Sequence, residues 1–136
     1  VGTDGIDQDL FGEARAHVLR HGEARDGLDR EIARRVACSQ SLASELFGEP
    51  AGTPTIAPGR RADLVVLDYD PPTPMTASNL QAHLAYGWRA SHVRDLFVGG
   101  ELVVQGHRLV RVDEKQLMAK ARAAAERLWE RAQGYM

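Results

Sequence analysis

The chain has 136 residues, which is the length of one ordinary domain. Hydrophobic residues make up 43% and charged residues 26%, a composition typical of globular proteins. A net charge of −2 argues against nucleic-acid binding, and no apolar run approaches the roughly 20 residues that cross a bilayer.

The sequence opens on Val1-Gly2-Thr3-Asp4-Gly5, which predicts a short strand ending at a turn. A carboxylate at the C-terminal end of a barrel strand lies where such barrels keep their chemistry. Asp4 is therefore a candidate metal ligand that also takes a proton from metal-bound water. Taken alone, the pentapeptide favours a simpler interpretation, a turn aspartate bonded to its own backbone. Because the first residue is Val rather than Met, we expect a truncated or processed chain.

Two helical regions follow. Asp9 is the predicted N-cap of a helix over residues 10–22, because its side chain can accept from the free amides of the first turn. A second helix is expected from Asp29, with a further, separate turn that ends at Gly48. Residues 49–61 carry three prolines and two glycines, which exclude regular structure and predict a domain boundary.

Beyond this boundary the pattern becomes that of strands. The β-branched run over 62–68 predicts a buried strand. Residues 92–98 and 101–105, joined by Gly-Gly, predict a tight hairpin, and 108–112 a third short strand. A short helix is expected over 79–87.

The chain ends in a predicted amphipathic helix from Asp113, its N-cap, to Ala132. Its apolar stripe comprises Leu117, Met118, Ala121, Ala124, Ala125, Leu128, Trp129 and Ala132. Such a stripe is usually core, and it becomes a partner-binding surface if the segment that covers it belongs to another polypeptide.

Other candidate sites are weaker. Glu13, His17 and His21 share one helix face, and two histidines four residues apart can bind zinc. However, zinc proteases of the zincin type have a Glu directly after the first His, and here Val18 follows His17. We therefore favour a solvated helix face. The acids Asp4, Asp7 and Asp9 lack the spacing of a calcium loop.

Cys38 is the single cysteine, which excludes an internal disulfide and fits a cytoplasmic protein. Because it lies among apolar residues of a predicted helix, we expect it to pack as a small hydrophobe.

These pieces, in this order, resemble the C-terminal third of amidohydrolase-superfamily enzymes, which are metal-dependent hydrolases. The resemblance rests on Gly2-Thr3-Asp4-Gly5, on Pro58-Gly59-Arg60-Arg61-Ala62-Asp63-Leu64-Val65-Val66, and on the hairpin with its Gly99-Gly100 turn. Within the superfamily the sequence is most similar to SsnA-type putative aminohydrolases, near the chlorohydrolases and guanine deaminases. The resemblance covers essentially the whole chain.

The resemblance implies an α/β fragment of three parts. Residues 1–48 would be the end of a (β/α)8 TIM barrel, 49–112 the C-terminal part of a small composite β-sandwich, and 113–136 a C-terminal helix. The implied activity is hydrolysis of a C–N bond of a small-molecule substrate by deamination, with water activated by a divalent metal, zinc or alternatively iron. Asp4 would be both the metal ligand and the catalytic proton shuttle.

The sequence departs from the family in lacking its other metal ligands, the His-x-His pair among them. One carboxylate cannot hold a catalytic zinc, which needs three protein ligands and a water. We therefore expect the isolated chain to be inactive and to bind no metal. We also expect it to pair with the remainder of the same polypeptide or to self-associate, because a lone barrel strand leaves open edges. The alternative is a standalone, non-catalytic oligomerisation or interaction domain.

Overall fold

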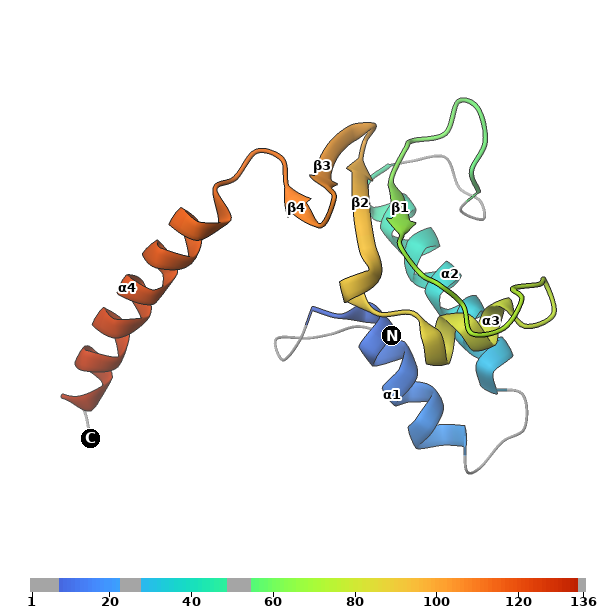
Figure 1. Ribbon diagram of the computed structural model, residues 1–136, viewed down its shortest axis with the longest axis horizontal. Helices are drawn as coiled ribbons and strands as arrows, with labels where there is room; N and C mark the ends of the chain where they lie inside the picture. The colour runs from blue at the N-terminus through green and yellow to red at the C-terminus, as the bar shows by residue number, and fades with distance from the viewer. Residues whose placement is uncertain (1–7, 23–27, 49–54, 135–136) are drawn as a thin grey trace.

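The computed structural model describes residues 8–22, 28–48 and 55–134. In Figure 1 two helices and a small sheet form one body, and the C-terminal helix stands away from it. The described part is thus an α/β arrangement with a four-stranded antiparallel sheet. The barrel and the composite sandwich stay predictions.

The first two helices are α1 (Leu10–Gly22) and α2 (Leu28–Leu46). Asp9 caps α1 as predicted, since its Oδ1 accepts from the backbone N–H of Phe11 at 3.0 Å. The separate turn expected before Gly48 is wrong, because α2 is one continuous helix. The hydroxyls of Ser39 and Ser41 donate to carbonyls four residues back, so they continue this helix instead of starting another.

A third helical segment completes the packing of α1 and α2. The short helix α3 (Leu80–Ala82) runs into the wider π-turn η1 (His83–Gly87), followed by the 3-10 turn η2 (Ala90–His92). The apolar core of the described residues consists of Ala14 and Val18 from α1, Ile32 from α2 and Ala85 from η1, each at most 1% exposed. The core therefore joins segments on both sides of the proline-rich stretch 49–61. The limits of the three predicted domains stay a prediction.

Two arginines hold the end of η1. The Nη1 atom of Arg89 donates to the carbonyls of Tyr86, Gly87 and Trp88 at 2.9, 3.2 and 3.0 Å. From α1, Arg15 donates to the same Trp88 carbonyl at 2.9 Å. Carbonyls left without a partner at the end of a helical turn are thus satisfied by cationic side chains.

The sheet is a meander in the order β1 (Leu64–Leu67), β2 (Val93–Val98), β3 (Glu101–Gln105) and β4 (Arg108–Leu109). All neighbours are antiparallel, with Val65 opposite Leu96 and Val98 opposite Glu101. The predicted strands are confirmed in position, although β4 has two residues instead of the five expected. The prediction that the first strand is buried is wrong, because no residue of β1 is fully buried among the described residues and Val65 is 52% exposed.

The β2–β3 turn explains why two distant parts of the sequence signature occur together. Gly99 and Gly100 have φ values of 58° and 84°, which side chains disfavour. A carboxylate oxygen of Asp63, the residue before β1, accepts from the Gly99 N–H, and the Ala62 carbonyl accepts from Gly100 at 2.9 Å. The Ala-Asp pair therefore secures the Gly-Gly turn across the sheet.

A second carboxylate serves the β3–β4 turn in the same way. Asp95 on β2 accepts from the Gly106 N–H at 2.9 Å and from the Arg94 guanidinium at 2.8 Å. These two hydrogen bonds hold the pKa of Asp95 below its ordinary value, the Gly106 bond being the larger cause.

The C-terminal helix α4 (Glu114–Gln133) begins as predicted, with Asp113 accepting from the Gln116 N–H at 3.0 Å. None of its residues is buried, and Leu128 and Trp129 are 54% and 66% exposed. Within the described part of the chain, nothing covers the apolar stripe. Among the same residues, no helix combines the length and apolarity needed to span a membrane.

The role of Asp63 in the turn is testable by substitution. Asp63→Ala should lower the free energy of unfolding by about 1 kcal/mol, because the Gly99 N–H loses its partner. Asp63→Asn, which keeps a carbonyl oxygen at the same place, should lose less. Urea unfolding of both variants measures the difference, and equal losses would contradict the turn-capping role.

Candidate functional site

The residue with the strongest sequence case lies outside the described part of the structure. Asp4 falls in residues 1–7, whose placement the structure does not describe. Its role as metal ligand and proton shuttle therefore stays a prediction. α1 begins six residues after it.

The remaining acids, histidines and the cysteine do not form a metal centre. Among residues 8–22, 28–48 and 55–134, no three His, Cys, Asp or Glu side chains lie close enough to hold an ion. A catalytic zinc needs three protein ligands and an open position. The described residues by themselves thus do not provide the three ligands that a catalytic zinc requires.

The Glu13, His17 and His21 face behaves differently from the expectation of a solvated surface. The His17 and His21 rings lie with centroids 4.7 Å apart at 49°, and His21 is exposed. The Nε2 atom of His17 is instead buried, and no hydrogen-bond partner is found for it among the described residues. The prediction is correct for His21, whereas Glu13 and His17 are half-buried rather than fully solvated.

His83 is the one titratable side chain found buried in the described chain, at 7% exposure. Its Nδ1 lies 2.9 Å from the Tyr69 hydroxyl, and its Nε2 lies 3.4 Å from the Thr73 hydroxyl. The Tyr69 ring in turn packs against His92 with centroids 5.2 Å apart. Since both ring nitrogens of His83 are engaged, we assign it to holding the 69–73 segment onto η1 rather than to catalysis.

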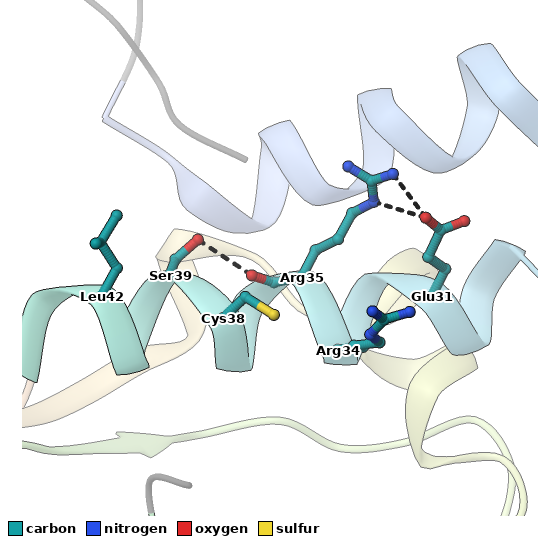
Figure 2. A pocket seen from close by; sticks show the side chains of 6 residues that line it. All are labelled: Glu31, Arg34, Arg35, Cys38, Ser39 and Leu42. Atoms are coloured by element: carbon teal, nitrogen blue, oxygen red, sulfur yellow. Dashed lines mark hydrogen bonds and ion pairs between the residues drawn. The ribbon is translucent and has the colours of Figure 1, made fainter. Parts of the chain in front are cut away.

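A hollow of about 380 Å³ lies along α2 (Figure 2). It is lined by Glu31, Arg34, Arg35, Cys38, Ser39 and Leu42. Two hydrogen bonds of 3.0 and 2.6 Å tie the Arg35 guanidinium to Glu31, and the Ser39 hydroxyl donates to the Arg35 carbonyl. The hollow therefore presents no nucleophile activated by a neighbouring base.

Cys38 corrects another prediction. The thiol is exposed in this hollow instead of packing as a small hydrophobe. The helix period did place apolar residues nearby, but Ile32, not the cysteine face, turns toward α1 and enters the core.

The described residues thus do not form a complete catalytic centre. Comparison with known sequences shows which proteins the chain is similar to. The chain is 30% identical over 97% of its length to a 5'-deoxyadenosine deaminase of Methanosarcina acetivorans. It is 32% identical over 98% to a 5-methylthioadenosine/S-adenosylhomocysteine deaminase of Natronomonas pharaonis. A deaminase of the latter name from Syntrophobacter fumaroxidans is 30% identical over 92%.

The chain belongs to the amidohydrolase superfamily. It spans only 30–32% of the length of these three relatives. No protein-family model and no solved structure matches it. The membership agrees with the resemblance seen in the sequence, whereas the placement nearest the SsnA-type branch stays a prediction.

Sequence reasoning missed the residues that organise η1. Tyr69, His83 and Arg89 lie in stretches without a clear periodic pattern, and their contacts join positions up to 14 residues apart. The one available signal was Gly87, a glycine at the end of a predicted helix, where a close approach of another side chain is common. A Cβ built at Gly87 would collide with the Tyr69 hydroxyl and ring.

This close approach predicts a strong effect of a small substitution. Gly87→Ala should lower the free energy of unfolding by about 1–3 kcal/mol, because the added methyl displaces Tyr69 from His83. Gly134→Ala is the matched control, since its Cβ meets only ordinary contacts and its φ of −71° suits alanine. Thermal unfolding of both variants tests the packing, and a neutral Gly87→Ala would contradict it.

Proposed function

We propose that this chain is the C-terminal part of a metal-dependent aminohydrolase that hydrolyses a C–N bond by deamination. The observation that carries the proposal is 30–32% identity, along nearly the whole chain, to curated proteins named as deaminases. On this proposal residues 1–48 complete a (β/α)8 barrel and 49–112 contribute to a composite β-sandwich. The antiparallel meander β1–β4 and its open β1 edge are compatible with the second assignment.

The substrate that we propose is a small molecule with an amine on a purine ring. The names of the relatives share an adenosine group, which carries one exocyclic amine. Guanine deaminases, to which the sequence also shows resemblance, act on the same kind of C–N bond. A cytoplasmic location stays part of this proposal.

The metal centre is the part of the proposal that this chain cannot build alone. When bound, a divalent ion, zinc or alternatively iron, would supply an activated water for the hydrolysis. Asp4 is the one residue of this chain that we assign to the metal. One carboxylate falls short of the three protein ligands that a catalytic zinc requires. The other ligands would then come from the remainder of the same polypeptide, and the isolated chain would be inactive.

A second candidate is a standalone oligomerisation domain without chemistry. The exposed apolar stripe of α4 favours it, because an interaction helix would present such a surface. The two candidates differ upstream of Val1. A coding frame that continues into a long segment with an early His-x-His supports the enzyme, and an initiator directly before Val1 supports the standalone domain.

The role of Asp4 can be tested in the proposed longer enzyme. Asp4→Ala should reduce turnover of an adenosine-type substrate by more than about a hundredfold while the thermal unfolding curve is preserved, because a ligand and a proton acceptor are lost together. Asp70→Ala removes an exposed carboxylate and is the matched control.

Activity of Asp4→Ala above about a tenth of the wild-type rate would contradict this role. Metal analysis adds a second measurement. Tight, stoichiometric zinc binding by the 136-residue chain alone would contradict the incomplete ligand set.

The open surfaces predict self-association of the isolated chain, through the β1 edge or through the α4 stripe. If α4 is responsible, Leu128→Glu should shift the chain toward monomer in sedimentation velocity, because a charge would replace an apolar contact. Ala119→Glu, on the opposite face of the same helix, is the control and should leave the assembly unchanged. A wild-type chain that sediments as a monomer and unfolds cooperatively would contradict self-association.

A further inference from the structure

The contact between α1 and α2 has a histidine at the edge of its apolar core. His17 directly precedes Val18, which is 1% exposed, and Arg35 comes one turn after Ile32, which is fully buried. The core of the described residues has only four members, and three of them belong to this contact. A charge at its edge therefore acts on a large share of the packing.

The surroundings of His17 favour its neutral form. The Nε2 atom is buried, and no hydrogen-bond partner is found for it in the described chain. His21, on the next turn of α1, lies with its ring centroid 4.7 Å away. Figure 2 shows Arg35 and Glu31 extending from α2 toward the neighbouring helix, with the Arg35 guanidinium bonded to the Glu31 carboxylate.

We propose that the packing of α1 on α2 is acid-sensitive, with His17 as the group that senses the proton. Among the described residues, the charged and titratable groups that act on the His17 ring are His21 on its own helix and Arg35 and Glu31 on α2. A protonated His17 would lie near the Arg35 guanidinium and the His21 ring. The single carboxylate of Glu31 already neutralises Arg35.

The direction of the effect follows from linkage. Burial, then Arg35, then His21 lower the pKa of His17 below its ordinary value of 6.5, against a smaller opposing effect of Glu31. In the unfolded chain His17 would take up a proton near that ordinary value, whereas the folded chain resists it. The stabilisation is therefore complete above pH 6.5 and is lost as the pH falls through the lower, folded pKa.

The first measurement is the pKa of His17, followed in the 136-residue chain through the NMR signal of its imidazole Cε1–H. We expect it below 6.5, and we expect Arg35→Gln to raise it, because this variant removes a cation that lowers the pKa of His17. A role of Arg35 in packing alone would not move the titration of His17. A His17 pKa at or above 6.5, or one that Arg35→Gln leaves unchanged, would overturn the proposal.

The second measurement is stability against pH. The folding equilibrium constant of the wild type should fall severalfold between pH 7.5 and 5.5, and His17→Gln should flatten this dependence. His107→Asn is the control, since it removes an exposed histidine in the β3–β4 turn and asparagine tolerates its positive φ of 65°. A His17→Gln variant with the wild-type pH dependence would overturn the proposal, and if that variant fails to fold, the Arg35→Gln titration still decides it.

Discussion

The packing of α1, α2 and η1 around Ala14, Val18, Ile32 and Ala85 is the contact on which the rest of the described structure depends. It brings together residues more than 50 positions apart, so the helices cannot form this unit without the segment that follows β1. Arg15 and Arg89 secure the same junction by binding the carbonyls at the end of η1.

The Ala62-Asp63 pair and the Gly99-Gly100 turn, which carry much of the resemblance to the family, have a structural role. Asp63 accepts from the Gly99 N–H, and Asp95 accepts from the Gly106 N–H, so each carboxylate satisfies a turn in which glycine adopts a positive φ. These contacts give a physical reason why an Ala-Asp pair and a Gly-Gly turn occur together in the sequence. The carboxylates of this chain therefore have two different roles. Asp63 and Asp95 stabilise turns, whereas Asp4 is the carboxylate that we propose for catalysis.

On the function proposed above, this chain would form one part of a longer enzyme. The described residues provide helices, a meander and an exposed amphipathic helix, and they bring no three metal-binding side chains together. Relatives named as deaminases are about three times the length of the matched region. A catalytic centre assembled from a distant part of the polypeptide would account for both observations.

The sequence by itself determined the local elements and the family. The N-caps Asp9 and Asp113, the helix of residues 10–22 and the hairpin around Gly99-Gly100 follow from short-range rules, because the residues that decide them lie within a few positions. Only the tertiary structure decided that Cys38 is exposed, that the Nε2 atom of His17 is buried, and that Tyr69, His83 and Gly87 form one packed unit. These facts depend on which face of each helix meets a neighbour, and periodicity identifies an apolar face without specifying the segment that will cover it.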